Sequence, residues 1–84
     1  MYSVRLTTTA IKELSGLPST MIARVTAAID RMEQDPRSGD VKKLKGQPVL
    51  WRNRIGDYRI LFTIDDKIHQ VIVFRILHRK DAYS

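Results

Sequence analysis

The 84-residue sequence contains no cysteine and no long apolar run. Without cysteine, neither a disulfide framework nor a thiolate metal site is possible, and the chain suits a reducing compartment. No apolar stretch approaches the ~20 residues that span a bilayer, and Met1–Arg5 contain no signal-peptide apolar core. We therefore expect a single cytoplasmic domain over residues 1–84, without membrane contact and just large enough to bury a modest core.

Several familiar catalytic motifs are also missing. The sequence has no glycine-rich phosphate loop, no metal-ligand spacing of histidine and acidic residues, and no serine–histidine–aspartate arrangement. These absences argue against a metallohydrolase or a serine hydrolase. We expect neither a metal nor a cofactor.

Acidic residues are scarce beside basic ones, since 15 Lys and Arg against 9 Asp and Glu give a formal net charge of +6. Most of the excess lies in residues 37–59, whereas residues 1–36 are balanced. A basic half beside a neutral half is typical of a binding face for an anionic partner beside a scaffold. A solvated charged loop over residues 37–45 stays open as the alternative for that segment.

The most informative stretch is Trp51–Arg59, in which Gly56-Asp57 separates two runs typical of strands and predicts a tight hairpin. Alternate side chains of a strand share a face, so Arg52 and Arg54 lie on the same face. Guanidinium groups are always charged and suit phosphate oxygens. Two or three of them on one small sheet repel one another unless an anion lies between them. A nucleic-acid backbone is the simplest such anion.

Periodicity predicts an α+β fold. A short strand over residues 2–6 precedes helices over residues 7–17 and 18–34, and strands follow over residues 50–55, 58–64 and 68–79. We expect an antiparallel β-sheet with a two-helix hairpin on one face, the face that carries Ile60, Phe62 and Phe74. The opposite face then carries the strand arginines, which are Arg52, Arg54, Arg59 and Arg79. Arg75 either extends this basic face or pairs with an acid such as Asp66.

Four motifs occur in order along the chain: Leu44-Lys45-Gly46, Trp51-Arg52-Asn53-Arg54, the run from Gly56-Asp57-Tyr58-Arg59 to Phe62, and His78-Arg79-Lys80-Asp81-Ala82-Tyr83. With the predicted element order, they resemble the RelE/ParE superfamily of bacterial toxins over essentially the whole chain. The resemblance implies a RelE-like fold. It also implies the toxin of a type II toxin–antitoxin system, an mRNA interferase that cuts the codon in the ribosomal A site.

In such enzymes cleavage needs no metal. The 2′-hydroxyl attacks the adjacent phosphate and leaves a 2′,3′-cyclic phosphate and a 5′-hydroxyl, so a proton must leave the 2′-oxygen and charge must be stabilised on the phosphorane. The expected partners are the ribosome, mRNA and an acidic RelB-like antitoxin. The alternative within the superfamily is a ParE-like toxin that poisons DNA gyrase without cutting RNA. A third class is an RNA-binding module without activity.

The resemblance also assigns site residues. Arg52 and Arg54 match the paired basic residues that line the cleavage site, and Arg59 matches the arginine that stabilises the phosphate. Arg79 matches a basic residue proposed as leaving-group acid or charge stabiliser, and Tyr83 matches a C-terminal tyrosine that stacks on or orients the substrate. Other basic residues are expected to contact the rRNA or mRNA backbone, namely Lys42, Lys43 and Lys45.

The general base stays undetermined at this stage. Some relatives have lysine where this chain has Arg52 and Arg54, and a lysine can be tuned into a base, whereas an arginine with a pKa above ~12 does not readily lose its proton. An unperturbed histidine has a pKa of ~6.5, which suits both a general base and a general acid, so His78 is the better candidate. His78 can act in catalysis only if the last strand bends or ends at this residue. In a regular strand, the alternation of side chains places His78 on the other face of the sheet from Arg79. Otherwise His78 is a partly buried strand-end histidine.

Overall fold

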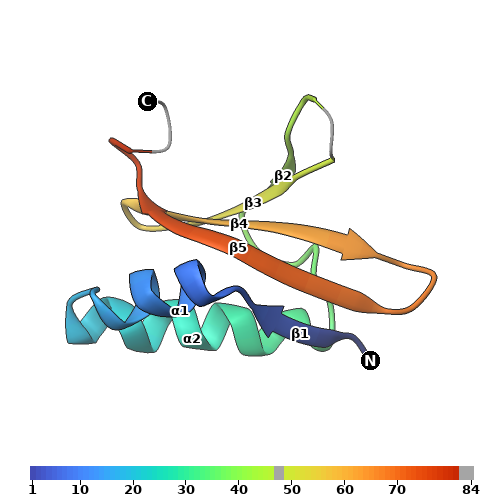
Figure 1. Ribbon diagram of the computed structural model, residues 1–84, viewed down its shortest axis with the longest axis horizontal. Coiled ribbons are helices and arrows are strands. Elements are labelled where there is room, and N and C mark those ends of the chain that lie inside the picture. Colours follow the sequence, from blue (N-terminus) through green and yellow to red (C-terminus); the bar gives the residue numbers. More distant parts are fainter. Residues whose placement is uncertain (47–48, 82–84) are drawn as a thin grey trace.

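The computed structural model describes residues 1–46 and 49–81. Within them the chain forms, in order, β1 (Ser3–Leu6), α1 (Thr8–Ser15), α2 (Ser19–Met32), β2 (Val41–Lys43), β3 (Trp51–Ile55), β4 (Tyr58–Asp65) and β5 (Gln70–His78). Figure 1 shows both helices on the same side of one sheet. The predicted α+β class and element order are confirmed. None of the described helices is long and apolar enough to cross a membrane.

The sheet has the strand order β1-β5-β4-β3-β2. Its β2–β3, β3–β4 and β4–β5 pairs are antiparallel, but β1 runs parallel to β5, so the expectation of a purely antiparallel sheet was wrong. Strand β1 pairs with β5, and a long stretch of chain connects the two. A connection of this length allows parallel pairing, whereas a short hairpin loop joins antiparallel strands. The short strand β2 lies inside the segment that we expected to be a loop.

The helices begin and end within two residues of the positions that the sequence predicts. The hydroxyl of Thr7 caps α1 by accepting a hydrogen bond from the Ala10 amide at 3.1 Å, and Gly16 follows the last turn. Helix α2 begins just after Pro18 and places its apolar stripe on the sheet, where Val25 and Met32 are almost fully buried. Burial of this stripe, rather than intrinsic propensity, holds both helices on the sheet.

The core face of the sheet comes from β4 and β5. Ile60 and Phe62 are fully buried, as predicted, and they face Ile76 and Val73 on the neighbouring strand. Phe74 was expected beside them, but it is 38% exposed. A β-bulge explains this error: Phe62 pairs with Val73 while Leu61 pairs with Arg75, so Phe74 is an extra residue and the alternation of β5 is reset there.

The hairpin between β3 and β4 positions the functional residues. Its loop is the predicted Gly56-Asp57 pair, and Gly56 has a φ of 58°, a left-handed value that glycine adopts without strain. The register places Arg54 directly opposite Arg59. On the other side of β4, Tyr58 pairs with His78, the last residue of β5. The residues that follow β5 therefore lie beside the hairpin turn.

Candidate nucleic-acid interface

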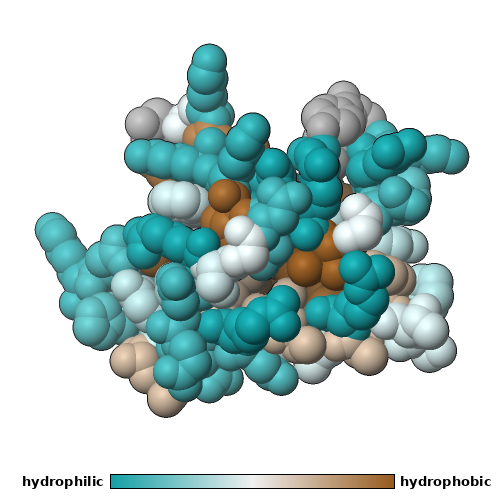
Figure 2. Space-filling model, turned by 180° about the vertical axis from the view of Figure 1, so that it is seen from behind, coloured by the Kyte–Doolittle hydropathy of each residue, from teal (hydrophilic) through white to brown (hydrophobic). Residues whose placement is uncertain are grey.

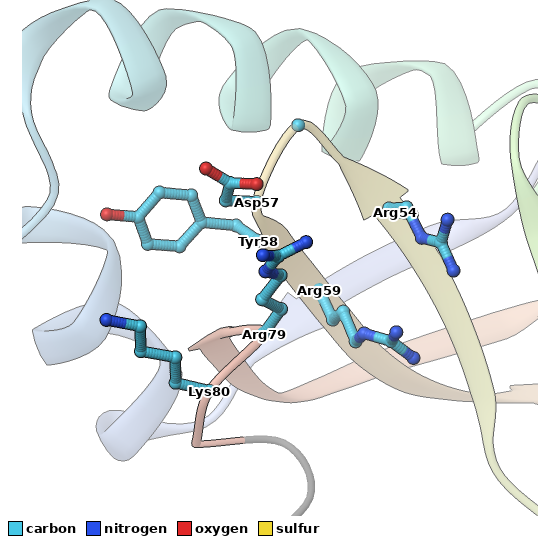
Figure 3. A pocket seen from close by; sticks show the side chains of 7 residues that line it. Arg54, Asp57, Tyr58, Arg59, Arg79 and Lys80 are labelled. Carbon is cyan, nitrogen blue, oxygen red and sulfur yellow. The ribbon is translucent and has the colours of Figure 1, made fainter.

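A pocket of about 450 Å³ lies at the turn between β3 and β4. Its lining comes from the turn, from the adjacent ends of both strands and from the segment after β5, and consists of Arg54, Gly56, Asp57, Tyr58, Arg59, Arg79 and Lys80. Figure 3 shows Arg79 between Tyr58 and Arg59. The cationic side chains outnumber the single carboxylate of Asp57, so the pocket suits an anion.

Arg54 and Arg59 form a pair of like charges in the pocket. These residues lie directly opposite each other on antiparallel strands, an arrangement in which like charges destabilise the sheet. The side chain of Arg54 is 47% exposed, and its Nε lies 4.0 Å from Asp40 Oδ2, at the outer limit of an ion pair. A phosphate between the two guanidinium groups would relieve their repulsion and accept hydrogen bonds from both.

The segment after β5 is fixed to the turn by its backbone. The Arg79 amide donates a 2.7 Å hydrogen bond to the Asp57 carbonyl, which carries the chain past the strand end and beside the turn. Arg79 and Lys80 thereby line the same pocket as Arg54 and Arg59. Asp57 and Lys80 were not assigned a role from the sequence. The signal that could have found them is the antiparallel register, because any residue that follows β5 must lie beside the turn that precedes β4.

Arg52 shares a face with Arg54, as predicted, but the structure does not bring it into the pocket. Only 5% of Arg52 is exposed, and its Nη1 donates to the Asp40 carbonyl at 2.9 Å and to Asp40 Oδ1 at 3.2 Å. The Arg54 amide also donates to the Asp40 carbonyl, at 3.0 Å. The anion expected between Arg52 and Arg54 is thus supplied by the chain itself. A buried arginine held in this way fixes the strand rather than meeting a substrate.

His78 ends β5, and its ring is held away from the pocket lining. Its Nδ1 accepts a 3.2 Å hydrogen bond from the Lys80 amide, which leaves the proton of a neutral ring on Nε2. The ring packs edge-on against Tyr58, with 5.2 Å between ring centroids. These contacts agree with the reading of His78 as a partly buried strand-end histidine.

The remaining predicted residues lie elsewhere. Lys42 and Lys43 are exposed on β2, the edge strand beyond β3, and Lys45 follows shortly after, so these lysines flank the pocket without lining it. Tyr83 lies outside the described residues. Arg75 follows the second of the two interpretations left open, because its guanidinium pairs with an acid at 2.9 Å, but that acid is Glu13 of α1. Asp66 pairs with Arg37 instead.

Within residues 1–46 and 49–81, no group of three or more His, Asp or Glu side chains could hold a metal ion. The pocket offers guanidinium groups for phosphate oxygens, one carboxylate and one phenol. Such a set can bind a phosphodiester and move a proton near it.

Comparisons with known proteins show that this helix-covered sheet has the fold found in solved toxin–antitoxin complexes. Residues 4–83 match the family model described as the ParE toxin of type II toxin–antitoxin systems, parDE, and the chain belongs to this family. The predicted membership of the RelE/ParE superfamily is confirmed, and the protein is a toxin of the type II toxin–antitoxin class.

The chain is similar in sequence to toxins named RelE and RelG. The chain is 34% identical to toxin RelG of Mycobacterium tuberculosis over 98% of this chain and 95% of that protein, and 32% identical to toxin RelE of the same organism over 98% and 86%. Among solved structures, the RelE–RelB complex of Pyrococcus horikoshii matches with a TM-score of 0.84 and 29% identity, covering 93% and 94% of the two chains. The RelBE2 toxin–antitoxin complex of Mycobacterium tuberculosis matches with a TM-score of 0.75 and 34% identity, covering 93% and 98%.

Proposed function

We propose that this toxin is a cytoplasmic endoribonuclease that cuts mRNA in the A site of translating ribosomes, without a metal ion. The observation that carries the proposal is the cationic pocket, in which Arg54 and Arg59 face each other across the hairpin and Arg79 joins them from the end of β5. Positive charge fixed on two strands and a tight turn is preorganised for the developing charge of a phosphorane. RelE and RelG relatives support the same class of activity.

The chemistry follows from the pocket groups. The 2′-oxygen forms a bond to phosphorus as its proton passes to a base, and the bond from phosphorus to the 5′-oxygen breaks. The leaving 5′-oxygen takes up a proton from solvent water, so that a 2′,3′-cyclic phosphate and a 5′-hydroxyl result. Arg59 and Arg54 stabilise the phosphorane oxygens. Arg79 stabilises the charge on the leaving oxygen, because a guanidinium does not readily give up its proton. We assign the role of base to Asp57, the carboxylate that lines the pocket.

The small size of the pocket supports dependence on the ribosome. A pocket of about 450 Å³ has room for one phosphodiester and the groups next to it. Most of the orientation that a 2′-hydroxyl needs for in-line attack would therefore come from the ribosome, which holds the message rigidly. The exposed lysines Lys42, Lys43 and Lys45 are placed to contact the phosphates of that holder or of the message. Naked RNA should therefore be a poor substrate.

The partner that silences the toxin is, in this proposal, an acidic RelB-like antitoxin. The solved relatives include RelE–RelB complexes, and this chain has a net charge of +6. Seen from behind, the molecule presents mostly hydrophilic side chains with apolar patches between them (Figure 2). A partly helical acidic segment that orders on binding would cover such a surface.

The test is inducible expression without any antitoxin, followed by primer extension on a translated message. Cuts within the reading frame that disappear when an antibiotic blocks the A site are the expected result. A gyrase poison is the competing function, and the ParE name of the family model favours it. It would leave messages whole and produce DNA breaks with an SOS response. That pattern would replace the ribonuclease proposal.

A further inference from the structure

An arginine outside the pocket lies against the other side of the same turn. Arg24 is an exposed residue of α2, and a Cβ built on Gly56 would lie 3.3 Å from its Nη1 and 3.8 Å from Met21 Cε. Gly56 also lines the pocket. Figure 3 shows the turn reaching to the helix behind it. A single layer of backbone therefore separates the guanidinium of Arg24 from the cationic pocket.

Arg24 has no acidic partner in the described part of the chain. The ion pairs of that part join Arg37, Arg52, Arg54 and Arg75 to carboxylates, and none includes Arg24. Its side-chain contact to the sulfur of Met21 is long, at 3.8 Å from Nη1. Its charge and almost all of its hydrogen-bond donors are therefore available to a ligand.

The surroundings of Arg24 favour a phosphate over a protein partner. Its neighbours one turn away on α2 are the exposed, small residues Thr20 and Ala27, the half-buried Met21 and the buried Ala28. None of the large exposed apolar side chains of the described residues lies on α2. A protein interface is centred on buried apolar or aromatic anchors, whereas a phosphate needs only charge and donors.

We propose that Arg24 binds the RNA phosphate adjacent to the one held in the pocket, so that the RNA backbone crosses the Gly56–Asp57 turn and continues toward α2. This assignment rests on the proposed ribonuclease function. Glycine at position 56 suits this path, because this residue of the turn places no side chain between the two phosphates. Arg24 then sets how tightly the message is held, while Arg54, Arg59 and Arg79 act on the bond that breaks.

The test compares Arg24→Gln with Arg31→Gln, a control that removes an exposed arginine from the same helix about 10 Å further along. Cleavage of a message on programmed ribosomes is measured against ribosome concentration at several salt concentrations. Arg24→Gln should raise KM about fivefold at 0.1 M salt and lower the salt slope of log KM by about 0.7, the value for one lost contact to a single strand. Its kcat should stay within twofold, and Arg31→Gln should match the wild type.

Arg24→Lys separates charge from packing and should keep KM close to that of the wild type. If Arg24→Lys fails as Arg24→Gln does, or if Arg24→Gln behaves like Arg31→Gln, the phosphate assignment is wrong while the ribonuclease proposal stands. If Arg24→Gln weakens only antitoxin binding, Arg24 belongs to the protein interface. Absence of cleavage by the wild type would instead overturn the proposed function itself.

Discussion

Like charges that face each other across strands are the residue-level signature of this toxin. Arg54 and Arg59 are opposed on β3 and β4, and Arg79 and Lys80 are brought beside them by one backbone hydrogen bond to Asp57. Arg52, the neighbour of this group on the same face, has its charge matched by Asp40. The sheet thus separates Arg52, whose charge is matched inside the fold, from the arginines that line the pocket.

Arg59→Ala should abolish toxicity and reduce mRNA cleavage on ribosomes by about 10²–10³-fold, because one fixed stabiliser of the phosphorane is lost. Single-turnover cleavage of a programmed message measures the effect. Arg5→Ala, which removes an exposed arginine from β1, is the matched control and should cleave like the wild type. Full activity of a folded Arg59→Ala protein would remove the central assignment.

Asp57→Asn and His78→Gln distinguish the two candidate bases. The carboxylate of Asp57 lines the pocket, whereas Nδ1 of His78 is occupied by the Lys80 amide. Asp57→Asn should therefore lower kcat by about 10²–10⁴-fold, the usual range for loss of a general base, and His78→Gln should change it little. The measurement is the pH dependence of single-turnover cleavage by both variants. The opposite ranking would assign the base to His78.

At the level of elements, the bulge in β5 is held in place from outside the sheet. The guanidinium of Arg75 makes contacts of 2.9–3.1 Å with both carboxylate oxygens of Glu13, and the Ile76 amide donates to Glu13 Oε1 at 2.8 Å. Helix α1 thus binds the strand directly after the extra residue Phe74. The Thr7 hydroxyl, which caps α1, also donates to the Phe74 carbonyl at 3.0 Å.

Glu13→Ala should lower the free energy of unfolding by about 1–3 kcal/mol, since a half-buried amide and a guanidinium lose their charged acceptor. Thermal unfolding followed by circular dichroism measures the change. Glu33→Ala is the control, because Glu33 is an exposed acid at the end of α2 and its replacement should alter stability by no more than about 0.5 kcal/mol. Equal effects of both substitutions would show that Glu13 does not hold the bulge.

The elements that the sequence predicts are those that depend on local patterns, and the ones it misses depend on contacts between distant residues. The helices and the Gly56-Asp57 hairpin depend on local patterns, namely a capping threonine, a 3.6-residue stripe and a glycine turn, and they were predicted correctly. The bulge depends on Glu13, which is 62 residues before Arg75, and no strand alternation reveals it. The parallel pairing of β1 and β5 is likewise a long-range contact.

The candidate site also has a part that the sequence predicts and a part that depends on a distant segment. The facing of Arg54 and Arg59 follows from the hairpin register, which the sequence supplies, whereas the burial of Arg52 depends on Asp40, which precedes β2 and is brought to β3 by its pairing. Strand alternation assigns a face to a side chain. It does not show whether a carboxylate from another segment already occupies that face.

On the scale of the whole molecule, a polar cluster joins segments that lie far apart along the chain. Asp66 accepts hydrogen bonds from the Tyr2 hydroxyl at 2.6 Å and from Arg37 Nη2 at 2.8 Å, and the Arg37 guanidinium lies 5.0 Å from the centre of the Trp51 ring. The Arg37 guanidinium, followed by the Tyr2 hydroxyl, lowers the pKa of Asp66. The Asp66 carboxylate in turn raises the pKa of Tyr2.

This cluster predicts a dependence of stability on pH. Because the folded-state pKa of Asp66 is lowered, its contribution is present above the unfolded value of ~3.9 and is lost as pH falls through the folded value. The difference in Tm between the wild type and Asp66→Asn should therefore be constant above about pH 5 and shrink in more acidic solution. Asp30→Asn, an exposed acid on α2 without a described ion pair, is the control. A difference in Tm that persists unchanged into strong acid would contradict this account.

The parallel pair of β1 and β5 has a consequence for biosynthesis. Ser3 pairs with Gln70 and Leu6 with Val73, so the first strand has no partner until the last described strand has been translated. Arg79 and Lys80 of the pocket emerge later still. Long-range pairing of this kind delays folding until the distant segment is available. A growing chain therefore carries no assembled pocket, and the pocket residues come together only after β5 and the residues that follow it have been made.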